Sequence, residues 1–279
     1  MTDDAATDVA PATSPATTSP ATTSPATAGG LRRRLAEGGP LLGALLRLPA
    51  ETLVEMVAIA GMDCVLLDLE HGATDLVSVQ HHVMAAQLHG VPTLARVGAD
   101  EPALVLRCLD LGVAGIVFPH VTSVEDARRA VAAAHYPPLG ERGFAAYSRA
   151  GRYGATPSAD HLDAGADTLV IVMIEDTAGC AASADILAVD GVDGVFVGPA
   201  DLSVALGLRG DAQHPDVLAA RRDVHEAAAK ASRAVIMIVS SPESAVEALD
   251  AGASLVLYNT AAVLTDTFRR LAAPRRPSP

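Results

Sequence analysis

The sequence predicts an α/β protein built as a (β/α)8 barrel. Half of its 279 residues are hydrophobic but only 3% are aromatic, and Trp is absent. The core must therefore consist of Ala, Val, Leu and Ile, which suits a buried parallel sheet. From about residue 40, short apolar runs alternate with longer amphipathic stretches, and eight such units close into a barrel of about 250 residues. The alternative, a doubly wound open sheet, usually carries a glycine-rich turn after its first strand, and no GxGxxG stands there.

The apolar runs are the predicted strands: Leu41–Leu46, Cys64–Leu69, Thr93–Val97, Gly115–Phe118, Thr168–Ile174, Gly194–Val197, Val235–Val239 and Leu255–Tyr258. The predicted helices between them include Ala50–Ala60, Leu76–Leu88, Pro102–Leu111, Val124–Ala134, Pro215–Ser232, Pro242–Ala251 and Ala261–Leu271. Three of these helices begin with proline, whose missing N–H is harmless in a first turn. Thr52 and Ser123 are candidate N-caps, because an acidic residue follows each by three positions.

The ends of the chain differ from the predicted barrel. Residues 5–28 repeat an ATTSP-like unit that offers nothing large to bury, so we expect residues 1–30 to form a disordered extension. We expect the barrel domain to span residues 31–273 and a short tail to span 274–279.

Charge and cysteine content exclude several classes of protein. A net charge of −13 argues against nucleic-acid binding, which needs a concentrated basic face. The sequence contains no run of about 18 apolar residues, so it predicts no membrane span. Cys64, Cys108 and Cys180 are an odd number without CxxC spacing, which favours a reduced, cytoplasmic protein.

Polar side chains follow five consecutive predicted strands. In a barrel, reactive groups come from the carboxyl ends of the strands and the loops after them. One such group would be unremarkable, whereas five in succession predict an active site. The strand ends are "LLDLEHG" with Asp68, Glu70 and His71, "LARV" with Arg96, "FPHV" with His120, "VMIED" with Glu175 and "VGPADLS" with Asp201.

Glu175 and Asp201 are candidate metal ligands. They stand 26 residues apart, one βα unit, so they should lie on adjacent strand ends. Two carboxylates there would repel unless a cation neutralised them. With oxygen ligands and no paired Cys or His, a hard ion such as Mg²⁺ or Mn²⁺ is expected. The alternative is that one carboxylate pairs with a barrel arginine.

Arg96 and His71 are candidate catalytic groups. A guanidinium at the barrel mouth can clamp a carboxylate or stabilise an enolate oxygen. The structural alternative is that Arg96 merely pairs with Asp68 on the neighbouring strand. The His71 imidazole can take a proton near neutral pH, with Asp68 fixing its tautomer. Alone, such a histidine is more often a satisfied polar residue.

The sequence "GPADLS" predicts a place for an anion. Gly198 lets a ligand approach the backbone, and the N–H groups near Ala200 and Asp201 open a helix. The only lysine in the chain, Lys230, lies in a helical stretch, which argues against an aldolase that forms a Schiff base.

At these residues the chain resembles the HpcH/HpaI aldolase family, the class II pyruvate aldolases. The resemblance spans roughly residues 40–272. The segments that carry it are "GMDCVLLDLEHG", "LARV", "GIVFPHVTSVEDARRAV", "YPPLGERGF", "VMIED" and "GVDGVFVGPADLS". It implies a phosphoenolpyruvate/pyruvate-type barrel that cleaves or forms 4-hydroxy-2-oxo acids through a pyruvate enolate.

The resemblance also implies roles for single residues. Glu175 and Asp201 would bind Mg²⁺ or Mn²⁺, with Co²⁺ as a further candidate. His71 would be the base beside Asp68, and Arg96 would hold the keto-acid oxygens. The backbone of Gly198 and Ala200, together with Asp201, would seat pyruvate. Asp110 matches an aspartate at a subunit contact of a hexamer or trimer whose last helix is exchanged between copies.

Departures from the family and two other functions remain. Met173 stands where the aldolases often carry Gln, and His120 where they carry an apolar residue. The first alternative is a lyase for a CoA ester of the malyl-CoA or citramalyl-CoA type, whose phosphates would need a basic rim from Arg142, Arg149 and Arg152. The second is a non-catalytic barrel that binds a metabolite.

Overall fold

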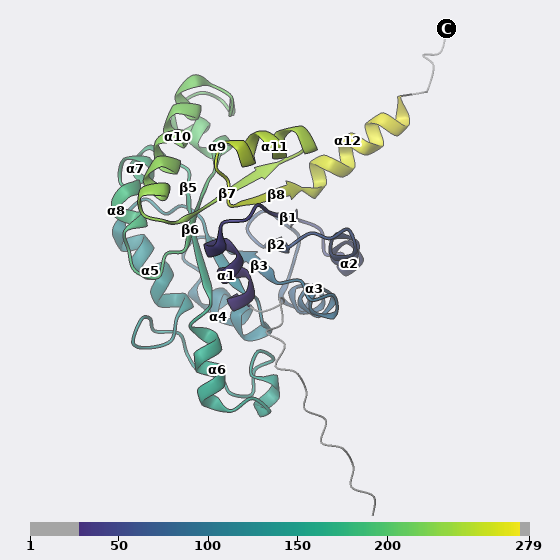
Figure 1. Cartoon of the computed structure of the whole chain (residues 1–279), viewed down its shortest axis with the longest axis vertical. Helices are drawn as coiled ribbons and strands as arrows, with labels where there is room; N and C mark the ends of the chain where they lie inside the picture. The colour runs from purple at the N-terminus through teal and green to yellow at the C-terminus, as the bar shows by residue number, and fades with distance from the viewer. Residues whose placement is uncertain (1–27, 274–279) are drawn as a thin grey trace, which may run out of the picture.

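The structure is a computed structural model that describes residues 28–273. Eight parallel strands form a closed barrel in the order β1-β2-β3-β4-β5-β6-β7-β8, with helices outside it (Figure 1). The predicted barrel is confirmed, and each predicted strand is present within one residue at either end. The strands are β1 (Leu41–Leu46), β2 (Cys64–Asp68), β3 (Thr93–Arg96), β4 (Gly115–Phe118), β5 (Leu169–Ile174), β6 (Gly194–Val197), β7 (Ala234–Val239) and β8 (Leu255–Asn259).

The predicted helices are present, and the structure adds others that the sequence analysis did not assign, most of them of eight residues or fewer. The main helices are α2 (Glu51–Ile59), α3 (Leu76–Leu88), α4 (Pro102–Leu111), α5 (Val124–Ala134), α10 (Pro215–Lys230), α11 (Pro242–Asp250) and α12 (Thr260–Ala272). The added helices are α1 (Ala28–Glu37), η1 (Arg152–Gly154), α6 (Ser158–Gly165), α7 (Thr177–Ala181), α8 (Ser183–Leu187) and α9 (Pro199–Ala205).

One of the two predicted helix caps is wrong. Ser123 caps α5 as expected, because its hydroxyl accepts a hydrogen bond from the N–H of Asp126. Thr52 instead lies inside α2, which begins after Ala50. The N–H of Ala50 donates to Nε2 of His82 on α3, so a tertiary contact determines where this helix begins.

Helix α1 closes the amino-terminal end of the barrel. Its Leu31 is fully buried among the side chains inside the barrel. Arg32 donates to the carbonyl of Thr168 and pairs with Asp193, just before β5 and β6. Residues 28–30, assigned from composition to the extension, therefore belong to this helix. Two predictions, the disorder of residues 1–27 and the short tail at 274–279, concern segments outside the described residues.

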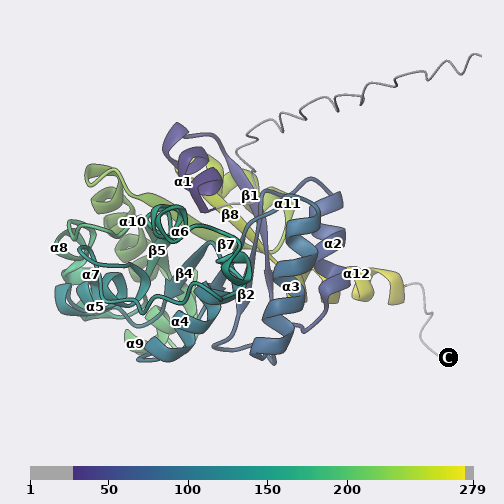
Figure 2. The same ribbon diagram turned by 90° about the horizontal axis from the view of Figure 1, so that it is seen from below.

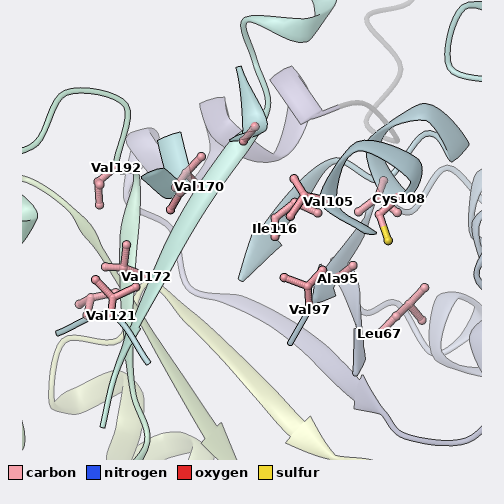
Figure 3. Close-up of a cluster of buried hydrophobic side chains, with 14 of the residues drawn as sticks. Leu67, Ala95, Val97, Val105, Cys108, Ile116, Val121, Val170, Val172 and Val192 are labelled. Atoms are coloured by element: carbon pink, nitrogen blue, oxygen red, sulfur yellow. The ribbon is translucent and has the colours of Figure 1, made fainter. Parts of the chain in front are cut away.

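The core has two layers, which follow from the alternation of side chains along each strand. Val170, Val172 and Ile174 of β5 face the helices and belong to a large Val-, Ala- and Leu-rich layer, part of which Figure 3 shows. Leu169, Ile171 and Met173 of the same strand fill the barrel interior. The near absence of aromatic residues is compatible with this packing, because branched aliphatic side chains fill both layers.

Helix α12 does not cover the barrel in the way the other main helices do. It extends away from the strands (Figures 1 and 2), and none of its residues is buried. Within residues 28–273, no helix is both long and apolar enough to cross a membrane.

Candidate active site

The alternation of side chains also aims three of the predicted site residues into the barrel. Leu66, Leu94 and Met173 point inward, so the residues two positions later, Asp68, Arg96 and Glu175, point the same way. All three side chains are buried at the carboxyl ends of β2, β3 and β5. The structure thus brings together, in one mouth, residues that the sequence places more than 100 positions apart.

Asp68 and Arg96 form the rigid base of this mouth. The strand register places them opposite each other. Arg96 donates to both carboxylate oxygens, from Nε at 3.0 Å and Nη2 at 2.5 Å. Arg47 donates a further hydrogen bond of 2.7 Å from Nε. Burial alone raises the pKa of Asp68, but these hydrogen bonds outweigh it and the pKa is lowered.

These hydrogen bonds leave one nitrogen of Arg96 for other partners. Its Nη1 lies 3.5 Å from the sulfur of Met173, which is a weak acceptor. Met173 therefore adjoins the one nitrogen of the guanidinium that Asp68 does not hold.

Glu70 occupies the centre of the mouth, although the sequence argument gave it no role. Its Oε2 lies 3.2 Å from Nε of Arg96, and its Oε1 lies 3.3 Å from Nε2 of His120. Oε2 is buried and has no hydrogen-bond partner. The signal was available in the sequence, because Glu70 lies two residues after Asp68 and so shares its inward direction.

Glu175 has the most perturbed carboxyl group of the mouth. Its pKa is raised to about 7, chiefly by burial, and the charges of Asp201 and Glu70 raise it further. Contacts with His120 act in the opposite direction. A carboxyl group that is buried beside other acids is stabilised by a bound cation or by protonation.

Asp201 lies across from Glu175 in α9, which follows β6. Gly198 caps this helix, and a Cβ at Gly198 would come within 2.6 Å of Oε2 of Glu175. A side chain there would displace the Glu175 carboxylate, so the close approach requires glycine. The N–H of Gly198 donates to the carbonyl of Ile174, and is therefore not free for a substrate carboxylate. Only the N–H groups of Ala200 and Asp201 could act as the predicted anion seat.

His71 lies at the rim, with its side chain about half exposed. Asp68 accepts a hydrogen bond from the main-chain N–H of His71, at 3.2 Å. The imidazole instead approaches Glu70, with Nε2 at 3.9 Å from Oε2. The expectation that Asp68 orients the imidazole therefore fails, because Arg96 and Arg47 already occupy its carboxylate.

The donor set fits a hard divalent ion. Within residues 28–273, no three His, Cys, Asp or Glu side chains form a ready-made metal site. Glu175 and Asp201 would be the protein ligands, and water and substrate oxygens would complete the coordination. The buried Oε2 of Glu70 lies 3.2 Å from Nε of Arg96 but accepts no hydrogen bond, so it can accept one from such a water.

Asp110 and the predicted basic rim lie at the opposite end of the barrel. Asp110 is near the carboxyl end of α4, and Arg142, Arg149 and Arg152 belong to the connection from α5 to α6 and β5. Arg142 donates to Asp110, and Arg149 donates to the carbonyl of Leu111. Arg142 also lines a pocket that reaches His120, whereas Arg149 and Arg152 are not among the residues that line it.

A pocket of about 740 Å³ adjoins the mouth. It is lined by the loops after β3 and β4, including Gly98, Pro119 and His120, and continues between α4 and α5. His120 therefore has the acidic cluster on one side and open space on the other.

The chain is similar in sequence and fold to known proteins. Residues 44–259 match the model of the HpcH/HpaI aldolase/citrate lyase family. The chain is 38% identical over 192 residues to a pyruvate aldolase of Rhizobium etli, covering 69% of this chain and 75% of that protein. It is 35% identical to a hydroxypyruvate/pyruvate aldolase of Cupriavidus necator, covering 85% and 89%. A crystal structure of a family protein from Burkholderia cenocepacia superposes with a TM-score of 0.84 at 34% identity, covering 89% of this chain and 100% of the other.

Proposed function

Because the chain belongs to the HpcH/HpaI aldolase/citrate lyase family, a family of carbon–carbon lyases, we propose that it is a divalent-metal-dependent aldolase. Its reaction makes or breaks the bond next to the carbonyl of pyruvate or a related 2-keto acid. The compounds cleaved or formed are 4-hydroxy-2-oxo acids, in keeping with relatives such as a 4-hydroxy-2-oxo-heptane-1,7-dioate aldolase of Salmonella dublin, 35% identical over 224 residues.

The buried Glu175 is the observation that carries this proposal. Its carboxyl group is desolvated beside Asp201 and Glu70, and its pKa is raised to about 7. A divalent ion bound there would supply a Lewis acid to the keto-acid carbonyl. Mg²⁺ or Mn²⁺ suits the oxygen ligands, and Co²⁺ is a further candidate.

Arg96 binds and orients the keto acid. Nε and Nη2 are fixed by Asp68, so Nη1 is the donor directed at a substrate oxygen. A preorganised guanidinium stabilises negative charge on that oxygen as the carbon–carbon bond breaks. Asp68 acts through Arg96, and the N–H groups of Ala200 and Asp201 bind the substrate carboxylate.

His71 moves the proton of the aldol hydroxyl. It is the imidazole at the rim whose ring is free of Asp68, and its half-exposed position lets it exchange protons with water. A Schiff-base route has no candidate lysine, because Lys230, the only lysine of the chain, ends α10 outside the barrel.

Deuterium exchange into the methyl group of pyruvate tests this function without the physiological acceptor. The metal-free protein should exchange no faster than buffer, and Mg²⁺ or Mn²⁺ should restore exchange. Glu175→Gln should remove it even at high metal concentration. Full exchange in a chelator, or trapping of the protein on pyruvate by borohydride, would refute the proposal.

We also propose that the protein forms a homo-oligomer in which α12 packs on a second copy. This helix has no buried residue, and Phe268 and Leu271 are 64% and 71% exposed. Such apolar exposure favours an interface. Asp110 would lie at a subunit contact, as the family resemblance implies. Phe268→Asp should lower the mass measured by light scattering, whereas a monomeric wild type would contradict the proposal.

A further inference from the structure

His120 makes an unusual pair of contacts with one oxygen of Glu175. Its main-chain N–H donates to Oε1 at 2.9 Å, and Nδ1 of its ring lies 2.9 Å from the same atom. The residue has a left-handed backbone, with φ of 55°, which L side chains rarely adopt. This conformation accompanies a turn after β4 that brings both the main chain and the ring to Glu175.

The second oxygen of Glu175 faces the opposite side of the mouth. Oε2 adjoins Gly198, where a Cβ would come within 2.6 Å of it. Gly198 leads directly into α9, whose first turn carries Asp201. One carboxylate oxygen is thus engaged by His120, and the other is presented toward the second candidate ligand.

The ring of His120 also reaches a second carboxylate. Nε2 lies 3.3 Å from Oε1 of Glu70, whose Oε2 lies 3.2 Å from Nε of Arg96. Side chains from β2, β3, β4 and β5 and their loops are thereby joined in one chain of contacts, from Arg96 through Glu70 and His120 to Glu175. Movement of the His120 ring would break its contacts with both carboxylates, while the main-chain hydrogen bond to Glu175 would stay in place.

We propose that His120 is a positioning residue, which holds Oε1 of Glu175 so that Oε2 points to the cation shared with Asp201. This inference rests on the proposed function, because it presupposes the metal. His120 binds neither metal nor substrate in this role. It acts through Glu175.

If His120 served mainly to stabilise the fold, removing its ring would lower the stability of the protein more than its metal affinity. The side chain of His120 is 52% exposed and adjoins the pocket, so removing the ring leaves no cavity in either core layer. The main-chain hydrogen bond to Glu175 remains in any variant that keeps the turn. Loss of the ring should therefore change metal affinity more than stability.

The test compares His120→Ala with His120→Asn. Asn tolerates the left-handed backbone, and its amide can donate to Oε1 of Glu175. Arg209→Ala is the matched control, because Arg209 also has a φ of 55° but is not among the residues of the mouth. The measurements are the dissociation constant for Mn²⁺, from the EPR signal of free Mn²⁺, and the melting temperature of the metal-free protein.

Removing a partner that orients a metal ligand typically weakens metal binding by about 10- to 100-fold. We expect His120→Ala to show a loss of this size, with a melting temperature close to that of Arg209→Ala. His120→Asn should recover part of the affinity, and Arg209→Ala should bind Mn²⁺ like the wild type.

Two results would overturn the inference and leave the proposed function intact. The first is wild-type Mn²⁺ affinity in His120→Ala. The second is an imidazole nitrogen coupling in the pulsed EPR spectrum of the wild-type Mn²⁺ complex that disappears in this variant, which would make His120 a ligand. If the wild type binds no Mn²⁺, the proposed function itself fails.

Discussion

Arg96 donates hydrogen bonds from two of its nitrogens to the two oxygens of Asp68. The strand register places these residues opposite each other at the ends of β2 and β3. Asp68 is fully buried, and Arg47 supplies a third hydrogen bond. The two buried charges depend on each other, because Arg96 without Asp68 keeps only Glu70, at 3.2 Å, as a counter-ion, and Asp68 without Arg96 keeps only the more exposed Arg47.

Asp68→Asn should therefore destabilise the fold. The amide keeps the size of the side chain but leaves Arg96 and Arg47 without their shared negative charge. The expected loss is about 3–5 kcal/mol of unfolding free energy, the range for a broken buried pair. Chemical denaturation measures it. Asp250→Asn makes the same change on an exposed acid of α11 and should stay within about 0.5 kcal/mol of wild type. Equal stability of both variants would contradict the structural role of Asp68.

Arg96→Lys should impair the chemistry although it keeps the charge. A lysine has all its donors on one nitrogen, whereas the planar guanidinium holds Asp68 with two nitrogens and presents a third nitrogen to the substrate. We expect deuterium exchange into pyruvate at saturating Mn²⁺ to fall by about 10²- to 10³-fold, as for loss of a donor to a developing oxyanion. Arg107→Lys, on the exposed face of α4, is the control. Exchange at the wild-type rate in Arg96→Lys would show that Nη1 does not serve the substrate.

The sequence predicts most of the barrel because the apolar runs of the strands, and their alternation with amphipathic helices, are patterns of residues that are close in the chain. The eight apolar runs mark the strands, and the polar residues at five consecutive strand ends mark the mouth, which is why Asp68, Arg96, Glu175 and Asp201 can be named in advance. Asp110, in the last turn of α4, and Arg142, after α5, show how this reasoning can be extended: they lie at the carboxyl ends of helices and not of strands, so the chain order alone assigns them to the opposite end of the barrel.

Other features depend on contacts that the sequence does not show. The start of α2 is determined by His82 of α3, and not by the nearby Thr52. His120 reaches Glu175 and Glu70 only because its backbone is left-handed, and a single histidine after a strand gives no sign of that. The roles of such residues cannot be predicted from the sequence, because they depend on contacts between elements that are distant in the chain.

Gly198→Ala should weaken metal binding by displacing Glu175. The backbone of Gly198, with φ of −82°, suits any residue. The new Cβ would lie 2.6 Å from Oε2 of Glu175 and from Cε of Met173, which end flexible side chains, but also 2.9 Å from Cβ of Glu175, which cannot move without its backbone. The melting temperature should therefore fall, and Mn²⁺ affinity should fall because Glu175 is displaced. Gly207→Ala, where no atom lies within 4 Å of the added Cβ, is the steric control. Unchanged Mn²⁺ affinity in Gly198→Ala would show that Oε2 does not face the ion.

The raised pKa of Glu175 predicts how metal binding depends on pH. Burial is its main cause, and the value of about 7 exceeds the ordinary value of 4.5. In the metal-free protein, the protonated group therefore contributes stability that is fully present below pH 4.5 and is lost as the pH rises through 7. The metal binds the ionised form, so its affinity should change in the opposite direction.

Titration of Mn²⁺ affinity between pH 5.5 and 8.5 measures this competition. The dissociation constant should be nearly constant above pH 8 and should rise about tenfold for each unit below pH 7, because one proton must leave for each ion bound. The rise in melting temperature caused by Mn²⁺ should likewise be larger at pH 8 than at pH 6. Asp250→Asn should reproduce the wild-type profile, while Glu175→Gln should lose both the affinity and its pH step. A dissociation constant that stays flat across this range would mean that Glu175 does not exchange a proton for the ion.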